Sequence, residues 1–270
     1  WGYNYSYRYG RTQTAPQPQG GQTYPGQSQP LLTASPAVRA EAFLSTLQPF
    51  VQESVILTLR VLSSDNLKTV DVALPKSDAV VINKLDGPST SVVTRAGKTE
   101  IQNELHYLLI PLRSGRLHLE SLRVTGSFVQ SSSGYGGNRE FNITTDRGLD
   151  LEVKPAAPGV QPWLPLQHLA LRTELQGVSK VEAGQPFTLM VELTAVGAGG
   201  SQLPSLESQL QSPDFRVYRE KSRTSVELTP DGRYLNGVRR DSFTLVPQYG
   251  GDLKLPELRL AWWNVNTGSL

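Results

Sequence analysis

The chain has 270 residues, of which 38% are hydrophobic and 19% are charged, and its 26 Lys and Arg nearly balance its 24 Asp and Glu. This apolar content is enough for more than one hydrophobic core, so we expect two globular units. Acids and bases are interspersed, and no block of like charge marks a nucleic-acid arm or an anchor on an anionic membrane. Cysteine is absent, which excludes disulfides, thiolate metal sites and cysteine nucleophiles but leaves the compartment open.

Residues 1–37 are predicted to be a Tyr-rich start followed by a flexible linker. The segment is rich in Gln, Gly, Pro, Tyr and Ser, a composition that cannot bury enough apolar surface to offset its ordering entropy. Tyrosines at every second position from Tyr3 to Tyr9 fit either one strand or a disordered segment. The chain begins at Trp1 without a signal pattern or an apolar stretch of roughly 20 residues, so we interpret it as a soluble, mature or trimmed fragment whose anchor would lie outside it.

Residues 38–155 are predicted to form the first β-sandwich. Short runs of β-branched and aliphatic residues, such as SVILTLRV (54–61), are separated by turn residues and indicate strands. Gly97 predicts a hairpin turn because glycine supplies a positive φ. Only the segment from Ala37 to Leu47 favours a short helical turn. The other strand candidates are AVVINKL (79–85), SVVTR (91–95), TEIQNELHYLLIPL (99–112), LHLESLRVTGSFV (117–129), FNITT (141–145) and LDLEVK (149–154).

Residues 156–164 predict a short, stiff hinge, and residues 165–270 predict a second β-sandwich. The stretch PAAPGVQPWLP (155–165) is rich in proline, which fixes φ and cannot donate to a strand ladder. Pro230-Asp231-Gly232 is a turn signal between strands. The strand candidates are LALRTEL (169–175), PFTLMVELTAV (186–196), DFRVYRE (214–220), SVELTPDGRYLNGVRRDSFTLVP (225–247) and GDLKLPELRLAWW (251–263).

An internal repeat indicates two copies of one sandwich. YLLIPLRSGRLHLESLRV (107–124) aligns without gaps on FTLVPQYGGDLKLPELRL (243–260), and upstream VILTLRV (55–61) matches FTLMVEL (187–193) at nearly the same offset. The spacing suits modules of immunoglobulin size. We interpret the shared phrase as a hairpin that closes each sandwich. The predicted fold class is therefore all-β, with two tandem immunoglobulin-like β-sandwich domains preceded by a flexible Gln/Pro/Gly-rich segment.

Residues suited to proton transfer or metal binding are few and scattered. His106, His118 and His168 are the three histidines, and each is expected to be an ordinary surface or edge residue, because no HExxH or paired-His motif joins them. Asp146 and Asp150 are close in sequence and leave an opportunistic cation site open. No serine lies in a Gly-x-Ser-x-Gly elbow. The sequence therefore predicts neither catalytic residues nor a cofactor.

Two glycine-containing motifs do not fit a phosphate site. Gly97-Lys98-Thr99 resembles the end of a phosphate loop, but Val92 occupies the position of the first glycine. Gly134-Tyr135-Gly136-Gly137 lacks the strand-to-helix context of a pyrophosphate site and is interpreted as a loop tip. Asn4-Tyr5-Ser6 and Asn142-Ile143-Thr144 fit the glycosylation sequon, a pattern that is common by chance.

Three tryptophans are the candidate partner-binding residues. Trp262 and Trp263 are adjacent on an expected strand, so their side chains should point to opposite faces, one into the core and one outward. Tryptophan is enriched at interface hot spots, which makes the exposed indole a candidate contact. The alternative is that it covers the junction between the modules, where Trp163 could also pack.

Several segments together resemble the BatD family, also called the oxygen-tolerance or aerotolerance family. The first module is similar through SVILTLRVLS (54–63), Asn66-Leu67 and YLLIPLRSG (107–115), and it departs from the family where Gln52-Glu53 replaces a common glycine. The more specific pattern lies in PWLP (162–165), AGQPFTL (183–189), QLP (202–204), LPELRLAWWN (255–264) and Thr267-Gly268.

The resemblance implies tandem immunoglobulin-like domains in the bacterial periplasm, tethered to the inner membrane by a helix that would follow the second module. It also implies an association with MoxR-type ATPases and von Willebrand factor A proteins, and a role in oxygen or stress tolerance. The family offers no catalytic residues to carry over. Many members have a further sandwich upstream, so the Tyr-rich start would be the remnant of that junction.

Three functions follow from these observations. The leading hypothesis is a non-enzymatic envelope scaffold or adaptor that binds protein partners, with pairing at exposed sheet edges as the expected mode. The second is a carbohydrate-binding or adhesin module, because an exposed tryptophan can stack on a sugar. A cryptic hydrolase ranks last. No nucleic acid is expected as a partner.

Overall fold

The computed structural model describes residues 38–129, 139–177, 182–251 and 254–270. The chain divides into two compact units, 1–35 and 36–270, and the description concerns the second unit. The predicted Tyr-rich start and linker (1–37), the sequon at Asn4 and the glycine loop at 134–137 lie outside the described residues. Within the described part of the chain, the only helical elements are two 3₁₀ turns, and no helix is long and apolar enough to cross a membrane. The prediction of an all-β fold is confirmed.

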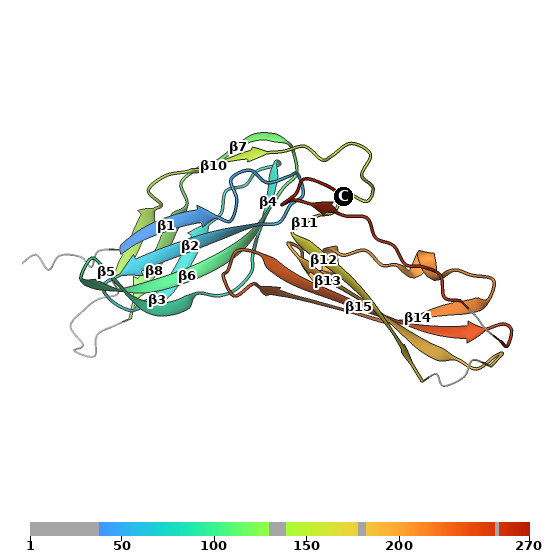
Figure 1. Cartoon of the computed structure of the whole chain (residues 1–270). Coiled ribbons are helices and arrows are strands. Elements are labelled where there is room, and N and C mark those ends of the chain that lie inside the picture. The colour runs from blue at the N-terminus through green and yellow to red at the C-terminus, as the bar shows by residue number, and fades with distance from the viewer. Residues whose placement is uncertain (1–37, 130–138, 178–181, 252–253) are drawn as a thin grey trace, which may run out of the picture. The chain divides into compact units, whose positions relative to one another are not determined.

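The first hydrophobic core lies between one large sheet and two smaller ones (Figure 1). Alternating side chains of the large sheet, such as Leu57, Leu59 and Leu105, are fully buried, as expected for strands that turn one face toward a core. The small sheets contribute Val124 and Leu151 to the same core. The large sheet has the order β1 (Val38–Leu44), β2 (Val55–Ser63), β6 (Lys98–Pro111), β4 (Val80–Lys84), with β5 (Ser89–Arg95) also paired to β6. The small sheets are β3 (Leu67–Ala73), β8 (Arg123–Phe128), β9 (Glu140–Thr144), and β7 (Gly115–Leu119) paired with β10 (Leu149–Val153).

The turn predicted at Gly97 joins β5 and β6. Arg95 pairs with Lys98, so the loop has two residues, Ala96 and Gly97, with φ values of 49° and 76°. Two successive positive φ values are the geometry of the two-residue hairpins whose twist matches that of the strands. The turn at Pro230-Asp231-Gly232 also forms, with Gly232 at φ 68° and its N–H donating to the Thr229 carbonyl at 2.7 Å.

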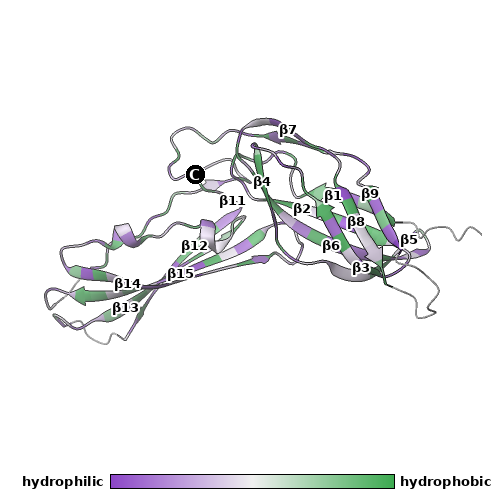
Figure 2. Ribbon diagram, turned by 180° about the vertical axis from the view of Figure 1, so that it is seen from behind, coloured by the Kyte–Doolittle hydropathy of each residue, from purple (hydrophilic) through white to green (hydrophobic). Residues whose placement is uncertain are grey.

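The second core has a sheet on one side and irregular chain on the other. Leu189, Val191 and Leu193 point from the sheet into the core, where they meet the 3₁₀ turns η1 (Gly200–Gln202) and η2 (Glu207–Leu210) and the extended segment 254–262. Figure 2 shows the alternation of hydrophobic and hydrophilic residues along the strands of this sheet. The sheet has the order β12 (His168–Gln176), β13 (Phe187–Val196), β15 (Leu235–Pro247), β14 (Phe215–Leu228), and a short parallel pair joins β11 (Pro165–Leu166) to β16 (Trp263–Asn264).

The segments that align in the sequence repeat occupy matching places in the two large sheets. Val55 of β2 faces Leu109 of β6, and Phe187 of β13 faces Leu245 of β15, so the two strand pairs keep one register at the offsets of the alignment. The aligned strands β6 and β15 both end at a proline. Gly115 and Gly251, which align with each other, have φ values of 112° and 117°.

The two copies do not close in the predicted way. Within the described strands, β7 pairs with β10 and not with β6, so the prediction of a hairpin after Pro111 is wrong and the chain crosses to another sheet instead. In the second copy, residues 254–262 belong to no strand, so the strand predicted over GDLKLPELRLAWW is limited to Trp263–Asn264. Pro256 stands where the first copy has Glu120, and proline has no N–H to donate to a ladder.

The helical turn expected between Ala37 and Leu47 is also wrong, because Val38–Leu44 is the edge strand β1. Alanine and leucine favour helix only weakly as single residues, and tertiary packing overrides that preference. Pairing with β2 buries Ala40 to 1% exposure and leaves Arg39 partly exposed. Two separate cores are present, but residues 36–270 form one compact unit, so the boundaries 38–155, 156–164 and 165–270 stay predictions.

Candidate partner-binding site

Two of the three candidate tryptophans lie together around Phe50. The Phe50 ring is 5.9 Å from the Trp163 ring and 6.0 Å from the Trp263 ring, centre to centre, and the two indoles are 5.9 Å apart. The parallel pairing of Pro165 with Trp263 brings the hinge and the C-terminal segment to this place. Edge contacts of this kind add about 1 kcal/mol per pair beyond the burial of apolar surface. We call these three residues the aromatic cluster.

Hydrogen bonds fix the turn that carries Phe50 to the chain around the hinge. Trp163 Nε1 donates to the Val51 carbonyl at 2.8 Å, and Gln167 Nε2 donates to Glu53 Oε1 at 3.3 Å. The other carboxylate oxygen of Glu53 accepts the Phe50 N–H at 2.8 Å. Glu53 is only 5% exposed, and this burial raises the pKa of its carboxyl above the usual range.

The departure at Gln52-Glu53 falls in this turn. Gln52 has a φ of 63°, the left-handed region that glycine occupies at low cost and other residues rarely adopt. The turn nevertheless forms, because the Glu53 N–H donates to the Phe50 carbonyl at 3.1 Å and the Gln52 N–H donates to the Pro111 carbonyl at 2.8 Å. Two backbone hydrogen bonds thus hold a conformation that a glycine would adopt more easily.

Trp262 lies apart from the aromatic cluster. Its side chain packs against the second core, and the residue itself precedes β16. Trp262 and Trp263 are both partly buried, so the expectation that one of them is exposed is wrong. The two adjacent indoles nevertheless contact different residues. Trp262 packs against the second core, and Trp263 contacts Phe50 and Trp163.

The three histidines differ in their surroundings. His106 is 8% exposed, so the expectation that it is a surface residue is wrong. Its Nδ1 lies 3.3 Å from Asp86 Oδ2 and its Nε2 lies 3.2 Å from Glu104 Oε1. The Asp231–Arg233 turn borders the same small cavity, of about 180 Å³, which explains a burial that strand alternation alone does not predict.

The other candidate ligands are exposed. His118 Nδ1 lies 2.7 Å from Asp150 Oδ1, and His168 stands exposed at the start of β12. Asp146 is exposed on the turn after β9, and Asn142 of the sequon is exposed on β9 itself. Across the described ranges, no three His, Asp or Glu side chains are grouped so that they could hold a metal ion.

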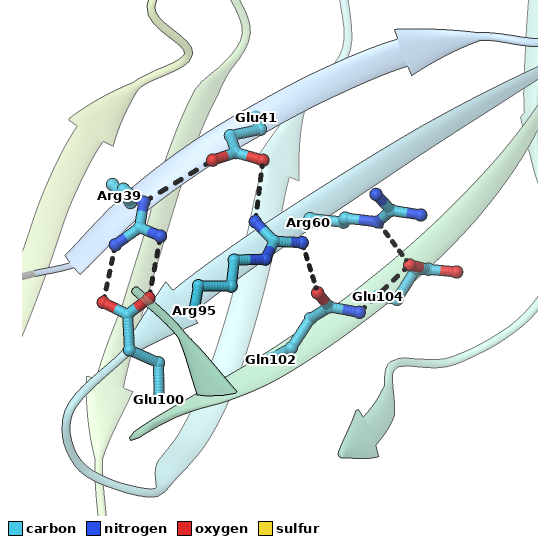
Figure 3. Close-up of polar contacts among 7 residues, drawn as sticks. All are labelled: Arg39, Glu41, Arg60, Arg95, Glu100, Gln102 and Glu104. Atoms are coloured by element: carbon cyan, nitrogen blue, oxygen red, sulfur yellow. Dashed lines mark hydrogen bonds and ion pairs between the residues drawn. The ribbon is translucent and has the colours of Figure 1, made fainter. Parts of the chain in front are cut away.

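Sequence reasoning missed a polar network on the outer face of the large first sheet (Figure 3). The Arg39 guanidinium donates two hydrogen bonds to Glu100, at 2.5 and 2.7 Å. Glu100 is 3% exposed, and the hydrogen bonds from Arg39 lower the pKa of its carboxyl. The alternation of charged residues along β1 and β6 was the signal that could have located it. The network continues through Glu41, Arg95, Gln102, Glu104 and Arg60.

The second sheet offers two edges for pairing. Among the described strands, β12 pairs only with β13, and β14 pairs only with β15. Such edges present a row of backbone N–H and C=O groups to any strand that approaches. The long edge strand β14 has a register shift between Arg219 and Lys221, a feature that commonly limits uncontrolled pairing. The shorter edge strand β12 has a continuous register from His168 to Gln176.

One comparison with known proteins identifies a family. A family model described as "BatD DUF11 like domain" matches residues 177–269. The match begins after β12 and includes β13, β14 and β15 with the C-terminal segment. The predicted resemblance to the BatD family is therefore confirmed for residues 177–269, and for the first module it stays a prediction. Searches of curated proteins and of solved structures found no match.

Proposed function

Because residues 177–269 match the model of a BatD-family domain, we propose that the protein is a non-enzymatic adaptor of the bacterial envelope. It binds other proteins and contributes to oxygen or stress tolerance. The family match supports an envelope protein associated with aerotolerance. The observation that carries the adaptor role is the pair of open edges on the sheet within and beside the matched region, β12 and β14.

The continuous edge strand β12 is the place where we propose that a partner strand pairs. A strand added there gains backbone hydrogen bonds along its length, and its alternate side chains reach both faces of the sheet. Leu175, near the end of β12, is 48% exposed and gives such a strand an apolar contact. A register shift makes β14 the less suitable edge.

The tryptophans have a supporting place in this proposal. The aromatic cluster and the hydrogen bond from Trp163 to Val51 hold the segment before β11 against the turn at Phe50. Trp163, Trp262 and Trp263 each keep part of their surface accessible, so they are the proposed partner contacts nearest to this junction. Partly buried indoles on a fixed backbone lose little conformational entropy when they contact a partner.

The proposed location is the periplasm, with tethering to the inner membrane by a segment outside this chain. The proposed partners are von Willebrand factor A domain proteins and, through them, complexes linked to MoxR-type ATPases. A metal ion is not part of the proposal, and no cofactor is needed for binding between protein surfaces.

Calorimetric titration of the chain with a purified von Willebrand factor A domain from the same bacterium tests this function. We expect saturable binding with a Kd in the micromolar range or tighter, reduced at least tenfold when a proline replaces Glu174 on the edge strand β12. The matched control is Lys76→Pro in the exposed segment before β4. The absence of binding heat with the unchanged chain would contradict the proposal.

A further inference from the structure

A groove of about 1120 Å³ lies on the outer face of the sheet β12-β13-β15-β14. Its lining residues on β13 and β15 alternate with those that enter the second core, so the groove opens away from that core. We propose that this groove binds a short, extended, acidic segment of a partner protein. The proposal rests on the adaptor function proposed above, and it adds a surface and the chemistry of the partner.

The strand register places three arginines in one row across the groove. Residues directly opposite each other in an antiparallel pair have side chains on the same face. Arg172 faces Glu192, Glu192 faces Arg240, and Arg240 faces Arg223. Within this row Glu192 is the single acid, and it is ion-paired with Arg240. In the described part of the chain, neither Arg172 nor Arg223 has an ion-pair partner.

The next row along the strands adds one more cation, Lys221, and a methionine. Glu174 faces Met190, Met190 faces Ser242, and Ser242 faces Lys221. Met190 is partly buried, and its sulfur accepts a hydrogen bond from Ser242 Oγ at 3.1 Å. Methionine adjusts its shape to different ligands. The two rows together contain four cationic and two anionic side chains, and we call them the cationic band.

The rows on either side of the cationic band carry no cation. One of them consists of Ala170, Thr194, Val238 and Ser225. The other consists of Gln176, Thr188, Thr244 and Tyr218, and Thr244 donates a hydrogen bond to the carboxylate of Glu220. The positive charge is thus confined to a narrow strip that runs across the strands.

The dimensions of the strip limit the length of the ligand. Four strands spaced about 4.8 Å apart span about 14 Å. An extended chain advances about 3.4 Å per residue, so four or five residues cross the strip, and every second side chain points toward it. A segment with Asp or Glu at every second position therefore presents two or three carboxylates to Arg172, Arg240 and Arg223. Arginine binds carboxylates with paired hydrogen bonds.

The acids within and beside the strip favour a peptide over a uniform polyanion. Glu174, Glu192 and Glu220 would repel a phosphate or sulfate chain, whose charges repeat without interruption. A peptide can place hydroxyl or amide side chains opposite these carboxylates. The groove therefore matches a polypeptide whose acidic residues are separated by neutral polar ones.

Fluorescence anisotropy with the full chain tests the proposal. The probe is a labelled heptapeptide with Glu at every second position and Ser or Thr between, and the reference probe has Gln in place of each Glu. We expect the acidic probe to bind at least tenfold more tightly than the reference at low salt, and its affinity to fall as salt is added. The Arg172→Gln, Lys221→Gln, Arg223→Gln triple variant should lose at least tenfold in affinity.

The matched control is a triple variant of equal charge change on other surfaces, Arg113→Gln, Arg116→Gln, Arg123→Gln, whose three arginines are exposed and which should bind the acidic probe like the unchanged chain. Equal binding by the groove variant and the unchanged chain would overturn the proposal, as would tighter binding of inorganic polyphosphate than of the acidic probe. The same groove variant is then titrated with the von Willebrand factor A domain. If this variant loses the probe but keeps the domain, the groove is rejected as the partner's binding site and the adaptor function stands. If the unchanged chain binds the probe but not the domain, the proposed partner class is rejected and the groove stands.

Discussion

Trp163 Nε1 donates a hydrogen bond to the carbonyl oxygen of Val51 at 2.8 Å. The two residues are far apart in sequence, and the bond joins the segment before β11 to the turn that precedes β2. Phe50, next to Val51, contacts both Trp163 and Trp263. A single indole therefore combines a directed polar contact with apolar packing at the point where the two cores are connected.

Replacing Trp163 separates these two contributions. Trp163→Phe keeps much of the packing but removes the donor, and we expect a loss of about 1 kcal/mol in the free energy of unfolding. Trp163→Ala also removes the ring and should cost about 2 kcal/mol or more. Urea unfolding followed by circular dichroism measures both. Tyr249→Ala, at a residue that is 64% exposed, is the control and should change stability little. An unchanged stability of Trp163→Phe would show that the hydrogen bond contributes nothing, and equal losses in the two Trp163 variants would show that the ring contributes nothing.

Glu53 should make the protein less stable as pH rises. Burial raises the pKa of this carboxyl in the folded state, so the folded state holds the proton more tightly than the unfolded chain. The free energy of unfolding then falls as pH increases from about 4.5 until the folded pKa is passed. Glu53→Gln should remove that fall. Its amide oxygen can accept the Phe50 N–H, and Gln167 can turn its amide so that Oε1 accepts from the new amide.

The measurement is urea unfolding of both proteins at a series of pH values from about 4 to about 8. We expect the stability of the unchanged chain to decline relative to Glu53→Gln across this range. If the stability of the unchanged chain instead rises relative to that of the variant, then Lys154 and the hydrogen bonds, which lower the pKa of Glu53, outweigh burial.

Glu100 should have the opposite pH dependence. The hydrogen bonds from Arg39 lower the pKa of its carboxyl, so its contribution is present above the unfolded pKa and is lost as pH falls toward the folded one. Glu100→Gln should therefore lose less stability than the unchanged chain between about pH 5 and about pH 2, as measured by thermal unfolding at each pH. The control Glu120→Gln, at an exposed residue, should lose stability with falling pH as the unchanged chain does. If Glu100→Gln also loses stability in parallel with the unchanged chain, the lowered pKa of Glu100 is contradicted.

Arg239 and Asp241 form a pair on the core side of β15. Arg239 Nε lies 2.8 Å from Asp241 Oδ2, and Asp241 is 3% exposed. Arg239→Met leaves the carboxylate buried without its cation and should cost about 3 kcal/mol, whereas the double variant Arg239→Met, Asp241→Leu should cost less than the single change. Equilibrium unfolding measures the loss of stability in the two variants. A double variant that loses as much stability as the single variant or more would contradict the coupling between Arg239 and Asp241.

The sequence predicted most strands because their side chains alternate with period two. The failures have local physical causes. β1 contains alanine and leucine, which favour helix, although Ala40 and Ala42 alternate with Arg39 and Glu41 in the strand pattern. Residues 254–262 repeat a leucine pattern, but Pro256 interrupts the ladder.

Features that depend on residues far apart in sequence could not be predicted. His106 lies on a strand face that the alternating pattern predicts to be exposed to solvent. Its burial comes from Asp86 and the Asp231–Arg233 turn. The aromatic cluster was anticipated only in part, because no pattern near Phe50 indicates that Trp163 and Trp263 approach it. The cationic band also needs the strand register, since Arg172, Arg223 and Arg240 come from three different strands.

Crosslinking in living cells tests the central claim, that this chain acts by binding proteins. A photoreactive amino acid is placed at Leu175 on the edge strand β12 or at Thr173 at the groove, and at the exposed Val92 on β5 as a control. After illumination, the adducts are identified by mass spectrometry. The account predicts that Leu175 or Thr173 forms an adduct with a von Willebrand factor A domain protein and that Val92 does not. Adducts with glycans alone, or no adduct at either position, would contradict it.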